Sequence, residues 1–411
     1  MVLRQETKTI LLEKPTYGGE CFGRLGDGRA VFVPFTLPGE VVRVRLVEEK
    51  RGFARGDVVE ILEPSPKRID PRCPHFTVCG GCHYQHMACK TQQQIKVDVL
   101  EDQLQRIGKI DDPPVAPLIP SPASWYYRNN IQFHLTPGGR LGFQSRRGES
   151  VVPVDECHLP EETLGQIWPL LDMEAIPGLD RIGLRVGAGS EVILTLESSD
   201  PQPVELVVGL PISVVHNGPG GSLVLAGSDH ISVEVAGRTF RVSGGSFFQV
   251  NTPMAGKMVA HILEGLHFPP GSVAIDAYCG VGLFSAFLAP HVERLIAIEA
   301  SPSACEDFVV NLDEFDNVEL YEAPTRDVLN HIELAVDILI ADPPRSGMDR
   351  DTLDAVKRLR PATLVYVSCD PATFARDAQR LIQGGFKLQK VTPFDLFPQT
   401  YHIETISFWS R

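Results

Sequence analysis

The sequence has 411 residues, of which 43% are hydrophobic and 22% charged, a composition that is typical of globular proteins and excludes long disordered tracts. Its length exceeds that of one ordinary core and predicts two or three domains. No segment reaches the roughly 18 uninterrupted apolar residues of a membrane span, and no signal-peptide pattern opens the chain. We therefore expect a cytoplasmic, monomeric protein without a membrane partner.

The net charge of −14 argues against binding of nucleic acid through the overall field of the molecule. Basic residues nevertheless gather in the N-terminal half, at Lys50, Arg51, Arg55, Lys67, Arg68, Arg72, Arg128, Arg140, Arg146 and Arg147. A local basic surface is therefore compatible with the sequence.

Residues 1–64 contain short runs of alternating hydrophobicity separated by glycine and proline turns. The runs lie at 30–35, 41–47 and 57–62. This pattern predicts a small OB-like β-barrel. Pro64, Pro66 and Pro71 then place a domain boundary near residue 65.

Residues 65–240 are predicted to form a second, mostly β domain, with strands at 131–135, 183–186 and 191–196. The segment 85–108 is different, because it lacks proline and has no glycine before Gly108. We expect a helix there with a glycine C-cap, packed on the domain that follows. The proline-rich run 111–122 is expected to be a linker.

Residues 241–411 change to apolar strands that alternate with helical stretches. The predicted strands are 273–276, 295–299, 337–340 and 364–367. Such alternation predicts a Rossmann-like, doubly wound α/β sheet. The fold class expected for the whole chain is therefore α/β multidomain.

The first strand of this sheet leads into a candidate cofactor loop. It ends in Asp276, after which Gly280 and Gly282 fall where the chain must turn sharply beside a ligand. Glu299 ends the next strand about 23 residues later, where a carboxylate can bind both ribose hydroxyls of an adenosine cofactor. Ser285 replaces the third glycine of a dinucleotide site, so S-adenosylmethionine is favoured over NAD, while a purely structural turn stays open.

Three further residues suggest covalent chemistry. Asp342 and Cys369 each follow a predicted strand at the same sheet edge, and Glu404 is an acid in the last apolar run. A thiolate added to C6 of uracil would make C5 nucleophilic toward a methyl sulfonium, and a base would then remove the C5 proton. A buried structural cysteine and a solvated glutamate are the alternatives.

Three cysteines, Cys73, Cys79 and Cys82, lie in one short segment, and Cys157 would supply a fourth ligand. A metal or cluster explains thiols so placed in a reducing compartment. Thiolates alone favour iron–sulfur over zinc, whereas neighbouring histidines keep zinc open, at His75, His83 and His86.

Together these residues closely resemble the RNA uracil-5 methyltransferases over nearly the whole chain, in particular the bacterial class that carries a TRAM barrel and a 4Fe–4S cluster and modifies large-subunit ribosomal RNA. The resemblance is carried by the segments just described and by Gly18, Gly19, Pro38, Gly39, Glu40 and the run from Ser246 to Asn251.

The resemblance assigns roles to individual residues. It implies that Cys369 is the nucleophile and Glu404 the base. The cofactor residues that it implies, together with the glycine loop, are Gln249, Tyr278, Gly280, Gly282, Glu299, Asp327 and Asp342. The cluster ligands that it implies are Cys73, Cys79, Cys82 and Cys157.

Two positions depart from the family pattern. Asp370 stands where an asparagine usually follows the nucleophile, and Leu283 replaces a polar cofactor contact of some relatives. A carboxylate beside Cys369 disfavours its thiolate, so we expect Asp370 to be protonated or turned away.

We therefore predict an S-adenosylmethionine-dependent enzyme that methylates C5 of a uridine in RNA, with ribosomal RNA as the first choice of substrate and transfer RNA as the alternative. The target base would be flipped into the pocket. Other hypotheses are a methyltransferase that acts on a base nitrogen, which has no use for Cys369, and an RNA-binding iron–sulfur protein with a vestigial methyltransferase fold.

Overall fold

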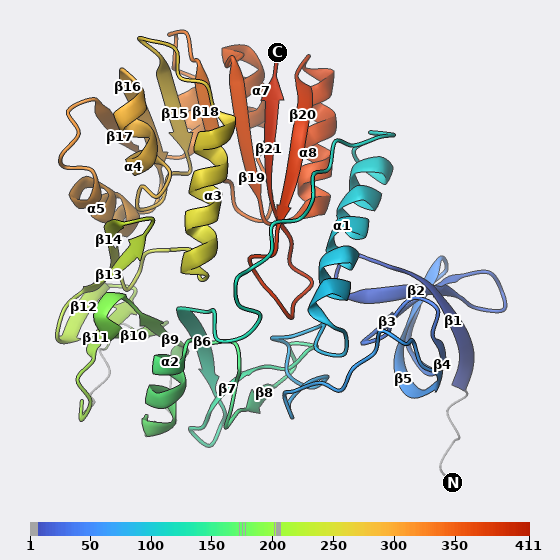
Figure 1. Cartoon of the computed structure of the whole chain (residues 1–411). Helices are drawn as coiled ribbons and strands as arrows, with labels where there is room; N and C mark the ends of the chain where they lie inside the picture. The colour runs from blue at the N-terminus through green and yellow to red at the C-terminus, as the bar shows by residue number, and fades with distance from the viewer. Residues whose placement is uncertain (1–6, 172, 175, 177, 201, 203–206) are drawn as a thin grey trace.

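The computed structural model describes residues 7–171, 173–174, 176, 178–200, 202 and 207–411. Figure 1 shows a C-terminal α/β unit above two β-rich units, the N-terminal barrel at the lower right and a central sheet at the lower left. The multidomain α/β architecture expected from the sequence is therefore confirmed.

The N-terminal unit is a closed five-stranded barrel with strand order β1-β2-β3-β5-β4. Its strands are β1 (Thr7–Pro15), β2 (Glu20–Arg24), β3 (Ala30–Pro34), β4 (Val41–Glu49) and β5 (Phe53–Glu63). Alternate residues point inward, as the sequence pattern requires, so that Val31, Val33, Val42 and Val44 are fully buried. Each such side chain contributes about 1.5–3 kcal/mol of burial free energy.

Helix α1 (Cys89–Arg106) connects the barrel to the C-terminal unit. It begins later than residue 85 because the chain before it makes a turn, in which Met87 N donates to Tyr84 O at 3.1 Å. Its side chains Leu100 and Leu104 are buried in the core of the C-terminal unit, while Ile95 and Val99 pack near the barrel. The helix therefore belongs to both units.

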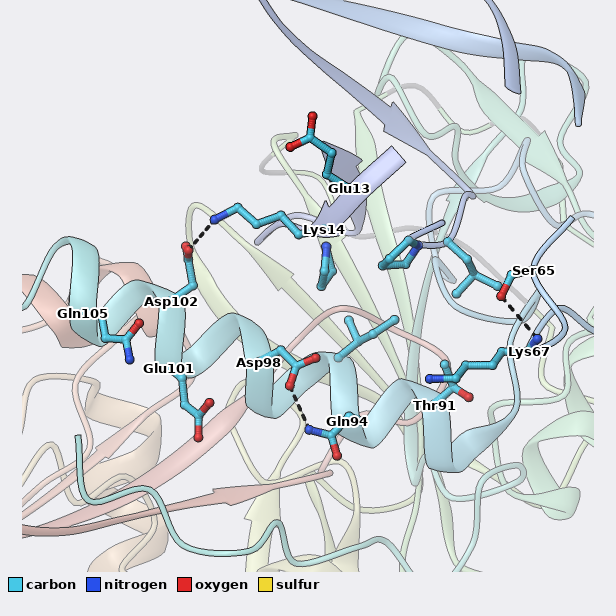
Figure 2. A pocket seen from close by; sticks show the side chains of 14 residues that line it. Glu13, Lys14, Ser65, Lys67, Thr91, Gln94, Asp98, Glu101, Asp102 and Gln105 are labelled. Carbon is cyan, nitrogen blue, oxygen red and sulfur yellow. Dashed lines mark hydrogen bonds and ion pairs between the residues drawn. The ribbon is translucent and has the colours of Figure 1, made fainter. Parts of the chain in front are cut away.

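A polar groove of about 530 Å³ separates the barrel from the other side of α1 (Figure 2). Lys14 of β1 spans it to Asp102 at 2.8 Å. The helix side of the groove carries further carboxylates, Asp98 and Glu101. Carboxylates thus outnumber the two lysines, Lys14 and Lys67, that line the same groove.

The central unit is a seven-stranded sheet of order β12-β11-β10-β9-β6-β7-β8. Its strands are β6 (Asn130–Leu135), β7 (Leu141–Gln144), β8 (Val151–Pro153), β9 (Leu179–Val186), β10 (Val192–Ser198), β11 (Ser213–Gly218) and β12 (Gly221–Ala226). Helix α2 (Glu162–Ile167) and the turn after it cover one face. There Phe133 stacks on Phe143 at 4.9 Å and contacts Trp168 edge-on at 4.8 Å.

The C-terminal unit is a seven-stranded sheet of order β17-β16-β15-β18-β19-β21-β20, parallel except for β21. Its strands are β15 (Val273–Ala277), β16 (Arg294–Glu299), β17 (Val318–Glu322), β18 (Ile338–Ala341), β19 (Thr363–Ser368), β20 (Lys387–Phe394) and β21 (Glu404–Ser410). Its helices are α3 (Thr252–Gly265), α4 (Ser285–Leu288), α5 (Pro302–Asn311), α6 (Thr325–Leu329), α7 (Arg350–Leu359) and α8 (Pro371–Gln383).

A hairpin of β13 (His230–Val235) and β14 (Arg238–Ser243) joins the central and C-terminal units. Its buried residues share one core with α3 and α5, so by packing it belongs to the C-terminal unit. Asp307 of α5 fixes the hairpin by accepting from Arg241 Nε at 2.9 Å and Ser243 Oγ at 2.6 Å. The boundary expected at residue 240 falls inside β14.

The segment expected as a linker covers an edge of the C-terminal sheet. Ala116 N donates to Val391 O at 2.8 Å, and Ile119 N donates to Pro393 O at 2.9 Å. It thereby pairs with β20, which would otherwise present an open strand edge. Among the described residues, no helix is both long enough and apolar enough to cross a bilayer.

Candidate active site

The carboxyl ends of the parallel strands β15, β16, β18 and β19 gather the predicted site residues at one sheet edge. Asp276 lies in β15, Glu299 ends β16, Asp342 follows β18 and Cys369 follows β19. The neighbouring β21 starts with Glu404 at the same edge. This is where open α/β sheets bind ligands.

The loop after β15 has the backbone geometry that its sequence predicts. Tyr278, Gly280 and Gly282 all have positive φ, at 65°, 54° and 94°. A Cβ on Gly282 would lie 2.4 Å from Leu312 Cδ1, so only glycine fits there. Leu283 packs into the hydrophobic core, which explains why it is apolar here.

Glu299 anchors the glycine loop. One of its carboxylate oxygens accepts from Gly280 N at 2.9 Å, and the other accepts from Ala300 N and Ser301 N at 2.8 Å. These bonds fix both oxygens beside the loop. The carboxylate is therefore preorganised at the position expected for a ribose contact.

Asp276 and Asp342 lie behind this loop, and the charge of Asp276 acts on Asp342. Asp276 is fully buried, accepts from Ser285 Oγ at 2.6 Å and leaves its other oxygen without a partner in the described chain. Burial raises the pKa of Asp276 to about 7. Burial, and then the charge of Asp276, raises the pKa of Asp342 to the same value. Ser285 therefore supports Asp276 at the position where a dinucleotide site would have its third glycine.

Gln249 is buried in the segment between β14 and α3. Its backbone oxygen accepts from Asn129 Nδ2 at 3.0 Å, and the backbone oxygen of Ser246 accepts from Arg185 at 2.9 Å. Within the described residues the Gln249 side-chain amide has no hydrogen-bond partner. It is therefore held by its backbone with its polar end available.

Asp327 is the one predicted cofactor residue that is exposed. It lies exposed on α6, and its carboxylate is 3.5 Å from the neighbouring Arg326. Tyr278, in contrast, is largely buried and lies near Thr325, the first residue of α6. Helix α6 therefore begins beside the glycine loop.

Cys369 and Glu404 lie close enough to influence each other. The pKa of the Cys369 thiol is raised to about 12, first by burial and then by the charges of Glu404 and Asp342, while Arg345 opposes the rise. Burial also raises the pKa of Glu404 well above its ordinary value; Asp342 adds to the rise and Arg345 opposes it. The surroundings of both groups therefore favour their neutral forms, and Arg345 is the cation that favours their ionised forms.

Residues 395–403, the loop that leads into Glu404, are clamped by α1. Lys96, which is fully buried, donates to Asp395 Oδ1 at 2.7 Å and to Phe397 O at 2.9 Å. Gln92 exchanges hydrogen bonds with Gln399 in both directions at 2.9 Å. In Figure 1 this loop lies below the sheet and extends toward the lower end of α1.

Asp370 caps helix α8. Its Oδ1 accepts from Ala372 N at 3.0 Å and Thr373 N at 2.9 Å, and its Oδ2 accepts from Tyr17 Oη at 2.7 Å. The carboxylate is thus turned toward the helix end and the barrel, which is the second of the two arrangements expected from the sequence.

The four cysteines of the predicted cluster line one cavity of about 1040 Å³. The pKa of Cys82 is raised to about 12, mainly by burial and to a smaller extent by the thiols of Cys157, Cys79 and Cys73, which are therefore its neighbours. No three His, Cys, Asp or Glu side chains of the described chain are arranged as a metal site. The four thiols thus lie near one another, and the expected iron–sulfur ligand set is not seen among the described residues.

The same cavity reaches the catalytic edge. Its wall includes Arg345 and His402, whose side chains are 3.0 Å apart, and the basic residues Arg128, Arg146 and Arg147. A local basic surface, compatible with the sequence despite the acidic net charge, thus lies between the cysteines and Cys369. Phe247 is 70% exposed on its rim.

Sequence reasoning gave no role to Arg345, Lys96 or Tyr17. Arg345 could have been noticed, because it directly follows the Asp-Pro-Pro turn at the sheet edge. The partners of Tyr17 and Lys96 are 353 and 299 positions away, so no local pattern identifies these residues.

Two family models and several known proteins match this chain. The model of the tRNA (Uracil-5-)-methyltransferase family matches residues 221–411, and that of the TRAM domain matches residues 2–59. An uncharacterized RNA methyltransferase of Thermosynechococcus vestitus is 33% identical over 98% of this chain and 97% of its own. One of Aquifex aeolicus is 34% identical over 98% and 99%.

A solved structure shares the whole fold. The Pyrococcus abyssi tRNA (uracil-54, C5)-methyltransferase in complex with S-adenosyl-L-homocysteine superimposes with a TM-score of 0.72 at 23% identity, covering 98% of this chain and 100% of that one. The relatives, the family models and the shared architecture agree. The chain belongs to the RNA (uracil-5-)-methyltransferase family and carries an N-terminal TRAM domain.

Proposed function

We propose that the protein transfers a methyl group from S-adenosylmethionine to C5 of a uridine in ribosomal RNA of the large subunit, through a covalent adduct with Cys369. The observation that carries this proposal is the meeting of Cys369, Glu404 and Asp342 beside a glycine loop at the carboxyl edge of the sheet. A methyltransferase acting on a base nitrogen would have no use for such a thiol.

S-adenosylmethionine would lie against the glycine loop. Glu299 would accept hydrogen bonds from its ribose hydroxyls, and Tyr278, Gln249 and Asp342 would line the remainder of the site. The free side-chain amide of Gln249 and the pocketed Asp342 suit a cationic, polar ligand. The solved Pyrococcus abyssi relative is a complex with the demethylated product of this cofactor.

The chemistry assigns one task to each catalytic residue. The Cys369 thiolate adds to C6 of uracil, and the electron pair moves toward C5, which takes the methyl group from the sulfonium. Glu404 then removes the C5 proton, so that the C5–C6 double bond re-forms and the thiolate leaves. Arg345 offsets the neighbouring carboxylates while the thiol is ionised.

We also propose that Cys73, Cys79, Cys82 and Cys157 hold a 4Fe–4S cluster. The donor set fits, because four thiols line one cavity, and thiolate is the ligand that iron–sulfur clusters use. Burial raises the pKa of all four thiols, so binding of a metal cation would have to displace their protons. The cluster would shape the RNA-binding wall of the cavity.

The RNA would enter the cavity between the cysteines and Cys369. Arg128, Arg146 and Arg147 would contact phosphates, and Phe247 offers an exposed ring on which a base can stack. Transfer RNA is the second candidate substrate, because the matching family model and the solved relative are both described as tRNA enzymes.

Trapping with 5-fluorouridine RNA tests this function. Fluorine at C5 cannot be removed as a proton, so the Cys369 adduct should persist on a denaturing gel. Fragments of large-subunit ribosomal RNA should be trapped and methylated in preference to tRNA transcripts. Preferential trapping of tRNA would replace the proposed substrate, and methylation without an adduct would overturn the covalent mechanism. Absence of methyl transfer to either RNA would favour the vestigial, RNA-binding alternative.

A further inference from the structure

The turn between β1 and β2 brings a barrel residue into the catalytic unit. Tyr17 lies in this turn, and its hydroxyl donates to Asp370 Oδ2 at 2.7 Å across 353 positions of sequence. The turn fits closely, since a Cβ on Gly19 would lie 3.1 Å from His83 Cβ and 3.3 Å from the Tyr401 ring. The contact is therefore built into the docking of the barrel.

Both carboxylate oxygens of Asp370 already accept hydrogen bonds. Its Oδ1 accepts from Ala372 N and Thr373 N at the start of α8, so that Oδ2 is left to Tyr17. Two anchors on one carboxylate fix its orientation. Because Asp370 directly follows Cys369, that orientation sets where its negative charge lies relative to the thiol.

We propose that Tyr17 is a positioning residue for the nucleophile: by donating to Asp370 it fixes the Cys369 loop and draws the Asp370 charge away from the sulfur. The inference rests on the proposed role of Cys369. It also explains how an aspartate is tolerated beside a thiol that must ionise, because a hydrogen bond from a neutral donor disperses the carboxylate charge.

The surrounding groups are consistent with this role. Glu404, Asp342 and Asp370 each disfavour the Cys369 thiolate, and Arg345 favours it. Replacing Arg345 would disturb both Cys369 and Glu404. The effect of Asp370 on the thiol, in contrast, can be changed through Tyr17 of the barrel.

Tyr17 itself faces Asp370, Tyr401 and Arg345. Burial, and then the hydrogen bond to Asp370, raises the pKa of Tyr17 far above its ordinary value. The hydroxyl therefore keeps its proton and stays a donor over the whole working range of pH. Its ring also packs edge-on against Tyr401 at 5.5 Å, and Phe at this position would preserve that contact.

The test is a double-mutant cycle of Tyr17→Phe and Asp370→Asn in the full chain, with Tyr321→Phe as the matched control. Tyr321 also donates to a carboxylate, that of Glu319 at 3.4 Å, but lies on β17 away from the thiol. The rate at which iodoacetamide alkylates Cys369 at about pH 8, followed by peptide mass spectrometry, reports the thiolate fraction without RNA or cofactor.

Tyr17→Phe should slow this alkylation about threefold or more, since a higher thiol pKa outweighs the gain in nucleophilicity. Asp370→Asn should accelerate it, and the double variant should behave like Asp370→Asn alone. In turnover, Tyr17→Phe should move the rise of kcat/KM to higher pH and leave the KM for S-adenosylmethionine unchanged. The control should match wild type.

Two results would overturn the inference. In one, Tyr17→Phe leaves alkylation unchanged, even if it lowers thermal stability, because the contact is then only structural. In the other, Tyr17→Phe slows alkylation by the same factor in the wild-type background and in the Asp370→Asn background, because the effect then does not pass through Asp370. Failure of RNA trapping in the wild type would remove the methyl-transfer role of Cys369 and leave the thiol measurement intact, so that the two failures are distinguishable.

Discussion

Burial raises the pKa of both proposed catalytic groups, and this predicts how activity depends on pH. The pKa of Cys369 is raised to about 12 and that of Glu404 also lies above its ordinary value. Each must lose its proton to act, so kcat/KM should rise with pH across the neutral range without a plateau near pH 5. A profile that is flat from about pH 5 to 8 would contradict this assignment.

Replacing the nucleophile should separate chemistry from cofactor binding. Cys369→Ala should lower turnover more than about a thousandfold, because the enolate cannot form without the thiolate. Binding of S-adenosylmethionine, measured by calorimetry, should be retained, since the glycine loop is built on other strands. Cys21→Ala, which removes a buried thiol of the barrel, is the control. Near-normal turnover of Cys369→Ala would rule out the covalent mechanism.

Glu404→Gln should stop the reaction at a later step. Methyl transfer can proceed, but proton removal and elimination cannot, so a covalent RNA adduct should accumulate while turnover falls roughly a hundredfold to ten-thousandfold. A denaturing gel detects the adduct with ordinary RNA. Glu319→Gln, which affects an exposed ion pair with Arg294, should leave no adduct. Absence of an adduct from Glu404→Gln would remove that residue from the role of base.

At the scale of single residues, the sequence predicted those site residues that lie in local motifs. Cys369 and Glu404 lie in recognisable segments, and the structure brings both to one edge with Asp342. It could not predict that Asp370 accepts from Tyr17, because the partner comes from another domain. Asp327 lies exposed on α6, and its place in the cofactor site stays a prediction.

At the scale of elements, the decisive contact joins α1 to the loop 395–403. Lys96 is fully buried and donates to Asp395 and to Phe397 O. The ammonium is thus compensated by one carboxylate and one carbonyl. The clamp fixes the entry to β21 and hence the position of Glu404.

Breaking this clamp should destabilise the protein and misplace the base. Lys96→Met leaves Asp395 buried without its cation and should cost about 3–5 kcal/mol of unfolding free energy, measured by urea denaturation of the full chain. Adding Asp395→Asn should recover part of that loss. Lys14→Met, which breaks the exposed pair with Asp102, should cost less than about 1 kcal/mol. Equal losses for Lys96→Met and Lys14→Met would refute the clamp.

The sequence located the strands better than the connections between them. Periodicity marks a strand because one face or both are buried, and the predicted strands recur within a few residues of their expected limits. The run 111–122 looked like a linker because prolines dominate it. Its pairing with β20 depends on a strand almost 300 positions later, which no local signal reveals.

At the scale of the whole molecule, the cysteine cavity joins the barrel side to the catalytic side. If the proposed cluster is correct, anaerobically purified protein should be brown and contain about four irons. Cys79→Ser should lower iron content and RNA affinity together, while binding of S-adenosylmethionine by the separate α/β sheet should change less. The control variant Cys305→Ser, which replaces a thiol outside the cavity, should contain as much iron as the wild type.

Metal analysis decides between the two metal hypotheses. Stoichiometric zinc and no iron would reject the cluster and leave the methyltransferase assignment intact. Dependence of each methyl transfer on a reductant would reject the purely structural role that we assign to the cluster.

The covered edge of β20 has a consequence for the evolution of this architecture. Residues 114–119 pair with the edge of the catalytic sheet, and a lysine of α1 is buried against Asp395. Both segments precede the central unit in the chain. A gene fragment beginning at residue 241 would therefore encode a sheet with an open edge and an uncompensated Asp395. The methyltransferase unit is thus interleaved with its neighbours and cannot be exchanged as a cassette. An ancestral barrel could be gained or lost at the end of the gene, but residues 89–120 must be inherited together with the catalytic sheet.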